Sequence, residues 1–386
     1  MGLAYTDKRG RIFYDASREP LADGGIVRPV LVGELIPAPA GTIPAMLPGR
    51  APLLRTGKAA RRTALAALLP AGYTRLLLPA YAERPGAPAL PLFGYTFACE
   101  HDDALYVAAM RTDEDPNWQP RTFAAGELEA LVATRLQRDP RNRVLAQLGR
   151  CSLEYGCFTA QNVFLAKGEA ALPVSPRCNA RCVGCISELD AEAAIPSPQE
   201  RISYEIDAEP VARIAIQHLT RVPDGIVSFG QGCEGEPLLR ATAIARAIEK
   251  IRAARSNGTI NLNTNGSLPK SLGRLIDAGL DAVRVSLNSF RPEAYAGYYR
   301  PRGYALDDVL ESVRLACARG LRVSVNLLTH PGVTDERAEI AAMREFLRAT
   351  PVALVQTRTL NIDPHVYFER VGRPSEPLGM RVALAA

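Results

Sequence analysis

The sequence lacks long hydrophobic runs and has few histidines and tryptophans. No apolar stretch among its 386 residues approaches the ~18 residues that a membrane-spanning helix needs, so we expect no membrane protein. The first ten residues are polar and charged, without the apolar core of a signal peptide, which predicts a cytoplasmic protein. The four histidines are scattered, so a histidine-based metal centre would need distant segments. The single tryptophan, Trp118, offers no stacking platform for single-stranded nucleic acid.

The composition is that of a chain able to bury a sizeable core. Hydrophobic residues make up 47% and charged residues 23%, which excludes disorder, collagen and coiled coil as structures of the whole chain. The net charge of +5 permits an acidic partner but does not require nucleic acid. At about 150 residues per domain, the length predicts two domains.

The density of proline and glycine and the hydrophobic pattern of the sequence change at about residue 165. Residues 1–165 are densely punctuated by proline and glycine and predict a smaller α+β domain. Its expected strands include residues 29–32 and 105–109, and its expected helices residues 125–137 and 143–155. Residues 166–386 alternate short β-rich runs with amphipathic helical patterns, which predicts a parallel sheet with right-handed crossovers. The expected strands cover residues 171–174, 226–229, 259–263, 282–287, 322–328 and 352–359. In such a sheet, chemistry lies beyond the carboxyl ends of the strands.

Three of the eight cysteines, Cys178, Cys182 and Cys185, fall within eight residues directly after the first of these strands. The spacing Cys-x3-Cys-x2-Cys lets three thiolates wrap one corner of a cubane, and soft thiolates favour iron–sulfur or zinc. Structural zinc usually takes four ligands, and no second Cys-x2-Cys pair is present. A zinc site completed by a distant cysteine or histidine is the alternative. Three protein ligands would leave one iron of a [4Fe-4S] cluster open to an outside ligand.

On these residues the sequence resembles the radical S-adenosylmethionine (SAM) superfamily, whose signature is this spacing after the first barrel strand. The resemblance covers about residues 170–370 and implies an α/β fold, a partial (β/α)6 radical SAM barrel. It also implies that SAM binds the open iron and is cleaved by one electron to a 5′-deoxyadenosyl radical. That radical would abstract a hydrogen atom from a substrate of unknown identity, with a peptide or protein side chain as our first hypothesis. A flavodoxin or ferredoxin would supply the electron.

Further segments match in the expected order. Gly235, Glu236 and Pro237 resemble the family's Gly-Gly-Glu-Pro segment, with Glu234 in place of the first glycine. The resemblance implies contacts to SAM from this segment and from polar residues near later strand ends. The predicted SAM-binding residues are Gly235, Glu236, Asn263, Asn265, Ser286, Asn288, Arg300, Asn326 and Arg358. Each has a plain structural interpretation as a turn or helix-cap residue. The family usually has an aromatic residue before the third cysteine, where this sequence has Gly184, so adenine packing must come from elsewhere.

The remaining cysteines carry weaker hypotheses. Cys233 lies in the loop expected to face SAM and would serve as a hydrogen-atom donor to a substrate radical. Cys151 and Cys157, with Cys99, would form a zinc or second cluster site if a break at Gly156 brought them together, while buried unreactive thiols are the default interpretation. Cys317 lies on an apolar helical stripe and belongs to the core.

The first 165 residues are expected to cover the barrel mouth and select the substrate, because clefts between domains are common ligand sites. Their basic run, Arg50, Arg55, Lys58, Arg61 and Arg62, would touch RNA, a phosphate or an acidic electron donor, or form a solvated face. From a different functional class, the alternative for the whole chain is a cysteine-liganded zinc or iron–sulfur module that binds nucleic acid without SAM chemistry. A simple electron carrier is a third alternative, and it would not need the polar residues at the strand ends.

Overall fold

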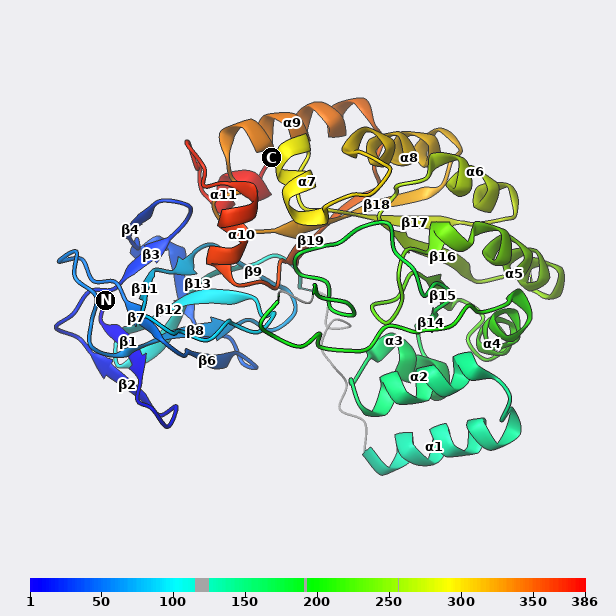
Figure 1. Cartoon of the computed structure of the whole chain (residues 1–386), viewed down its shortest axis with the longest axis horizontal. Coiled ribbons are helices and arrows are strands. Elements are labelled where there is room, and N and C mark those ends of the chain that lie inside the picture. Colours follow the sequence, from blue (N-terminus) through cyan, green and yellow to red (C-terminus); the bar gives the residue numbers. More distant parts are fainter. Residues whose placement is uncertain (115–124, 191–192, 256) are drawn as a thin grey trace.

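The computed structural model describes residues 1–114, 125–190, 193–255 and 257–386, and its centre is a six-stranded parallel sheet (Figure 1). The strands follow one another across the sheet in chain order. They are β14 (Glu169–Leu172), β15 (Ile226–Phe229), β16 (Thr259–Thr264), β17 (Ala282–Leu287), β18 (Arg322–Thr329) and β19 (Leu354–Thr359). All six predicted strands are present: two have the predicted ends, three are shifted by one or two residues at one end, and β14 begins and ends two residues earlier than predicted. The prediction of a partial (β/α)6 barrel is confirmed.

Helices between the strands cover the outer face of this sheet, with α4, α5, α6, α8 and α9 forming an arc around it (Figure 1). The helices after β14 are α4 (Ala208–Arg221), α5 (Ala241–Ala254), α6 (Pro269–Asp277), α7 (Pro292–Tyr299), α8 (Leu306–Ala318), α9 (Arg337–Ala349), α10 (Pro364–Val371) and α11 (Met380–Leu384). Gly320 has φ of 75° at the join between α8 and β18, the left-handed conformation expected of a glycine that ends a helix. No helix among the described residues is both long and apolar enough to span a bilayer.

The first 111 residues form short antiparallel strands to one side of the barrel (Figure 1). They are β1 (Leu3–Thr6), β2 (Ile12–Asp15), β3 (Leu21–Asp23), β4 (Val27–Pro29), β5 (Leu35–Pro37), β6 (Ile43–Leu47), β7 (Arg50–Pro52), β8 (Thr63–Leu68), β9 (Tyr73–Arg75), β10 (Leu78–Pro79), β11 (Tyr81–Glu83), β12 (Tyr95–His101) and β13 (Ala104–Arg111). The expected strand at residues 105–109 lies within β13. The expected strand at 29–32 is wrong, because the chain leaves β4 at Pro29 and turns into a 3₁₀ helix at Val32–Glu34. Proline has no N–H with which to continue a ladder.

Three helices connect these strands to the barrel: α1 (Ala125–Arg138), α2 (Arg143–Leu153) and α3 (Phe158–Leu165). The first two were predicted at residues 125–137 and 143–155. Buried residues of all three helices, such as Val132, Leu148 and Phe164, share one hydrophobic core with the barrel strands. The antiparallel strands instead enclose several small cores of their own. A domain boundary at residue 165 stays a prediction, and these core contacts favour one between β13 and α1.

Buried arginines join the antiparallel strands to the barrel beside β19. Arg50 is 3% exposed, and its Nη2 lies 2.9 Å from Asp363 Oδ2 at the start of α10. Arg75 is completely buried and donates to the carbonyl oxygen of Leu360 at 2.8 Å. The interpretation of the basic run as a solvated face is therefore wrong for Arg50, because its guanidinium is buried and paired with Asp363.

Candidate functional site

The two faces of the parallel sheet differ in polarity. On the outer face, Val283 and Val285 of β17 and Val325 of β18 are fully buried against the helices. On the inner face, Ser286 pairs in register with Asn326, and Asn326 with Gln356. These three polar side chains are partly exposed. Interiors of closed parallel barrels are usually filled by branched apolar side chains, so a polar, solvent-reached inner face indicates a place for polar ligands.

The cysteine loop follows β14, at the carboxyl end of the sheet. Cys178, Cys182 and Cys185 line one pocket of about 440 Å³ together with Arg201 and Asp190. The backbone N–H of Ala180 donates to Cys178 Sγ at 3.4 Å, and Arg201 Nη2 lies 3.3 Å from Cys185 Sγ. Burial raises the pKa of Cys178 to about 11 and that of Cys182 well above its usual value. The thiolate forms therefore need a strong positive charge in this pocket, which bound iron would provide.

The arrangement of the three thiols bears on which metal they fit. Among the residues that the structure describes, no three His, Cys, Asp or Glu side chains converge closely enough to hold one metal ion. Structural zinc needs such convergence, whereas each thiolate of a cubane binds a separate iron. The three cysteines around the shared pocket could each supply a thiolate to a different iron of a [4Fe-4S] cluster.

Backbone hydrogen bonds join the loop after β15 to the cysteine loop. Gly235 N donates to Ser175 O at 2.7 Å, and Glu236 N donates to Arg177 O at 2.8 Å. A Cβ atom at position 235 would lie 2.0 Å from Arg177 O. The glycine is therefore required here by close backbone approach, which is the physical reason that the Gly-Glu-Pro segment matches.

Two buried carboxylates brace these loops. Glu234 accepts four backbone hydrogen bonds, from Val174 and Ser175 at 2.7 Å and from Gly230 and Gln231 at 2.8 Å. Sequence reasoning treated Glu234 only as a departure from the family pattern and missed this role, for which the sequence held no signal. Burial raises the pKa of Glu234 to about 7, against the opposing effect of these donors.

Glu236 is likewise buried and is bonded within the protein. Its carboxylate accepts from Leu238 N at 2.9 Å, Asn265 N at 2.8 Å and Thr264 Oγ1 at 2.5 Å, and burial raises its pKa to about 7. Contact between Glu236 and SAM stays a prediction, and the structure assigns the side chain a bracing role between β15 and β16.

Several of the other predicted SAM-binding residues lie on the inner face of the sheet. Asn263 precedes the end of β16, and its Nδ2 donates to Phe229 O and Gly230 O at 3.2 and 3.0 Å. Ser286 and Asn326 are register partners, and Asn326 Oδ1 is buried with no hydrogen-bond partner among the described residues. Arg358 pairs in register with Leu328 of β18, two residues beyond Asn326. Burial, followed by repulsion from Arg284, lowers the pKa of Arg358.

The rest of the predicted set lies elsewhere. Asn265 Nδ2 donates to Asn179 Oδ1 at 2.9 Å and so braces the cysteine loop. Asn288 is fully buried and donates to Ala294 O and Tyr367 Oη at 2.9 and 3.0 Å, a contact within the fold. Arg300 has φ of 48° and forms an ion pair with Asp190 on the wall of the cysteine pocket. A non-glycine residue in the left-handed region costs free energy.

Tyr298 of α7 lies beside Gly184, where the family usually has an aromatic residue. The added Cβ of any larger residue at Gly184 would lie 3.1 Å from Tyr298 Oη. Tyr298 of α7 is buried, and its carbonyl oxygen accepts from Val183 N at 3.0 Å. The aromatic ring beside this loop therefore comes from α7 rather than from the loop itself.

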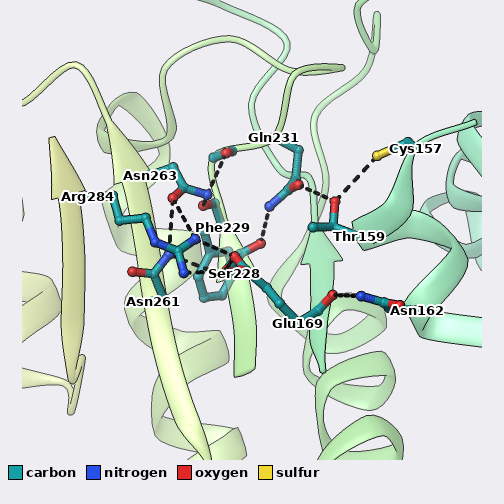
Figure 2. A network of polar contacts seen from close by, with 11 residues as sticks. Cys157, Thr159, Asn162, Glu169, Ser228, Phe229, Gln231, Asn261, Asn263 and Arg284 are labelled. Atoms are coloured by element: carbon teal, nitrogen blue, oxygen red, sulfur yellow. Dashed lines mark hydrogen bonds and ion pairs between the residues drawn. The ribbon is translucent and has the colours of Figure 1, made fainter. Parts of the chain in front are cut away.

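Deeper on the inner face lies a polar network that sequence reasoning missed (Figure 2). Arg284 forms a bidentate ion pair with Glu169 at 2.6 and 3.0 Å. Ser228 Oγ donates to Glu169 Oε1 at 2.5 Å and accepts from Asn261 Nδ2 at 3.1 Å. The available signal was the polar residues at alternate positions of the expected strands, which period-2 geometry places on one face.

The remaining cysteines separate into different surroundings. Cys233 is 5% exposed, and its thiol hydrogen-bonds with Cys151 of α2. It does not line the cysteine pocket. Cys157 lies at the start of α3, 3.4 Å from Thr159 Oγ1 (Figure 2), and Cys99 is buried in β12 within a separate core. The hydrogen-donor role of Cys233 stays a prediction, while a shared metal site for Cys99, Cys151 and Cys157 finds no support.

Comparisons with known proteins were made on the sequence and the fold. A family model described as the Radical SAM superfamily matches residues 172–343. The FeMo cofactor biosynthesis protein NifB of Klebsiella pneumoniae is 28% identical over 193 residues, which cover 46% of this chain and 40% of that protein. A GTP 3′,8-cyclase of Heliobacterium modesticaldum is 30% identical over 193 residues, covering 50% of this chain and 54% of the relative. The chain thus spans about half the length of the curated relatives it matches.

Among solved structures, a radical SAM methyltransferase from Sphaerobacter thermophilus superimposes with a TM-score of 0.40 at 17% identity. The match covers 54% of this chain and 59% of that one.

Proposed function

Since the chain belongs to the radical SAM superfamily, we propose that it is an enzyme that binds a [4Fe-4S] cluster through Cys178, Cys182 and Cys185 and cleaves SAM reductively. The observation that carries the proposal is the single pocket lined by all three thiols at the carboxyl end of the sheet. When bound, the cluster and SAM would supply a 5′-deoxyadenosyl radical that abstracts a hydrogen atom from the substrate.

The protein's own groups would hold and tune this centre. Arg201, which lies 3.3 Å from Cys185 Sγ, places a positive charge beside the thiolates and offsets part of their negative charge. Asn265 and the two buried carboxylates, Glu234 and Glu236, fix the loops that carry and face the cysteines. Because these contacts are made within the protein, the pocket would be preorganised before SAM arrives.

SAM would lie against the carboxyl ends of the strands, near Gly235, Asn263 and Asn265. Ser286, Asn326 and Arg358 on the inner face supply hydroxyl, amide and guanidinium groups suited to ribose hydroxyls and a carboxylate. Glu236, Asn288 and Arg300 complete the proposed set, with Asn288 and Glu236 acting through the positions of their neighbours. Cys233 is retained as a hydrogen-donor hypothesis.

The substrate would reach the polar inner face from the side of the antiparallel strands. These strands would cover one edge of the incomplete barrel, and the hydrogen bond from Arg75 to Leu360 O beyond the end of β19 supports this. A closed mouth would exclude water from a reactive carbon radical. A peptide or protein side chain remains our candidate substrate, and a flavodoxin or ferredoxin the candidate electron donor.

Anaerobic reconstitution followed by reduction in the presence of SAM tests the proposal. We expect about four irons per chain and release of 5′-deoxyadenosine. Cys182→Ser should lose both, whereas the matched variant Cys317→Ser, on α8 outside the pocket, should keep both. One tightly held zinc per chain with no nucleoside would instead support the zinc-module alternative and contradict the proposed function.

A further inference from the structure

Four arginines line a second cavity that is separate from the cysteine pocket. The cavity has a volume of about 690 Å³ and lies among α1, α2, α3 and α4. Arg135 and Arg138 come from the last turn of α1, and Arg213 and Arg221 from α4. The two pockets share no lining residue.

The cavity lies at the opposite end of the sheet from the cysteines. Helix α4 starts beyond the cysteine loop and runs back toward the beginning of β15, so its last turn is near the amino ends of the strands. His218 in that turn has its Nε2 atom 3.1 Å from Gly168 O, directly before β14. A ligand in the cavity would therefore not be the substrate of the proposed radical reaction.

The positive charge in this cavity is only partly balanced. Asp139 is the one carboxylate on its wall, and Arg213 Nη1 lies 3.2 Å from both of its oxygens. Arg135 donates to the neutral side chain of Gln217 at 2.8 Å. For Arg138 and Arg221 the described residues provide no ion pair within 4.0 Å. Three guanidiniums thus lack a paired carboxylate.

These arginines are close enough to repel one another. Burial, followed by the charges of Arg221 and Arg138, lowers the pKa of Arg135. The carboxyl-terminal dipoles of α1 and α4 offset part of this charge, each by about half an elementary charge. That compensation leaves an excess positive charge, which an anion in the cavity would neutralise.

The floor of the cavity is apolar. Leu131 of α1 and Ile216 of α4 line it and are partly exposed, whereas Leu145, Phe164 and Ile214 are buried. The cavity volume is within the range of about 300–1,000 Å³ that is typical of small-molecule sites. A bare inorganic anion would leave Leu131 and Ile216 in contact with water, so the lining favours an anion that also carries an apolar or aromatic part.

We propose that this cavity binds a phosphorylated organic molecule of nucleotide size. The planar guanidiniums of Arg135, Arg138 and Arg221 would contact the phosphate oxygens, which match their forked donors in geometry. The organic part would lie against Leu131 and Ile216. The proposal does not depend on the radical chemistry, so the two can fail separately.

Calorimetric titration of the cluster-loaded protein, with SAM in excess to occupy its own site, tests this. The probes are ATP, inorganic pyrophosphate and adenosine. We expect ATP to bind more tightly than pyrophosphate, and adenosine to show no binding. Arg135→Ala/Arg221→Ala should raise the dissociation constant for ATP by about 10-fold or more. Release of 5′-deoxyadenosine should not change.

Two further variants make the result decisive. Arg319→Ala/Arg337→Ala removes the same number of charges from exposed positions directly after α8 and at the start of α9, and should bind ATP as the parent protein does. Arg135→Lys/Arg221→Lys keeps the charge but loses the forked donors, and should give an intermediate affinity even if the alanine variant does not fold. Equal binding of pyrophosphate and ATP, binding of adenosine as tight as that of ATP, or unchanged affinity in the lysine variant would overturn the proposal.

Discussion

The parallel barrel and the antiparallel strands before it are stabilised in different ways. The barrel has one continuous hydrophobic core that extends from α1 to α10. The antiparallel strands divide their apolar residues among several small cores, and the buried ion pair of Arg50 with Asp363 ties them to the barrel. The difference indicates that the barrel can fold around its own core. The antiparallel strands contact it through these polar groups and a few apolar side chains, with Leu78 of β10 in the barrel core and Met380 of α11 in a core of the antiparallel strands.

The largest expected effect comes from the loop contact that assembles the proposed site within the barrel. Gly235→Ala places a Cβ atom 2.0 Å from Arg177 O, a backbone atom that cannot move without separating the two loops. We expect loss of bound iron and of 5′-deoxyadenosine release, measured after reconstitution. Gly273→Ala is the matched control, because its Cβ would lie 3.8 Å from Leu315 Cδ2 in ordinary contact. Full iron loading of the Gly235→Ala variant would contradict the role given to this approach.

The second effect concerns the contact between the two regions. Asp363→Ala leaves the Arg50 guanidinium buried without its closest carboxylate, which should cost about 3–5 kcal/mol of unfolding free energy. Limited proteolysis should then cleave within residues 1–111 before the barrel. Replacing both partners, as in Arg50→Met/Asp363→Leu, should recover part of the loss, because the buried guanidinium is removed as well. Recovery should be incomplete, since Asp363 also accepts from Tyr81 Oη and from His365 N. Equal protease resistance of Asp363→Ala and the parent protein would show that other contacts hold the antiparallel strands in place.

A smaller effect should appear as a pH dependence that belongs to the barrel alone. Glu339 of α9 is 2% exposed and accepts from Phe290 N at 2.7 Å, and burial raises its pKa from 4.5 to about 7. A carboxyl whose pKa is raised on folding contributes stability below its unfolded pKa and loses it as the pH rises through the folded value. The stability contributed by Glu339 should therefore fall between about pH 4.5 and 7, by at most about 3 kcal/mol.

Comparing Glu339→Gln with the parent protein by urea denaturation at pH 5 and pH 8 isolates this contribution. The glutamine variant should show a smaller loss of unfolding free energy between the two pH values. Parallel profiles for the two proteins would mean that Glu339 does not titrate in this range.

The smallest effect is expected at the surface of the antiparallel strands. Arg55 is 66% exposed and pairs with Glu19 at 2.9 Å. An exposed ion pair contributes little, so Arg55→Ala should change the unfolding free energy by less than about 1 kcal/mol. A larger loss, measured by chemical denaturation, would mean that polar contacts on this surface are as important as the buried ones.

The barrel could be predicted from the sequence and most of the antiparallel region could not. Residues such as Val309 and Val313, at helical spacing, and the glycine before β18 are local signals that hold wherever the segment lies. In the first 111 residues the strands have only two to eight residues, and many of them also pair with partners distant in sequence, such as β3 with β10 and β7 with β11. Arg50 illustrates the consequence: in the sequence it is the first of a basic run, and only its neighbour from residue 363 makes it a buried contact.

The sequence alone determined the strands of the parallel sheet, the end of the sheet that carries the chemistry and the three cysteines, because each depends on spacing along a short segment. Tertiary structure decided which polar side chains form hydrogen bonds within the protein and which remain able to bind a ligand. Glu234 and Glu236 accept hydrogen bonds from backbone N–H groups of other loops, while Asn326 Oδ1 is left without a partner among the described residues. A hydrogen bond needs its partner within about 3 Å, and the fold brings such partners together from distant parts of the chain.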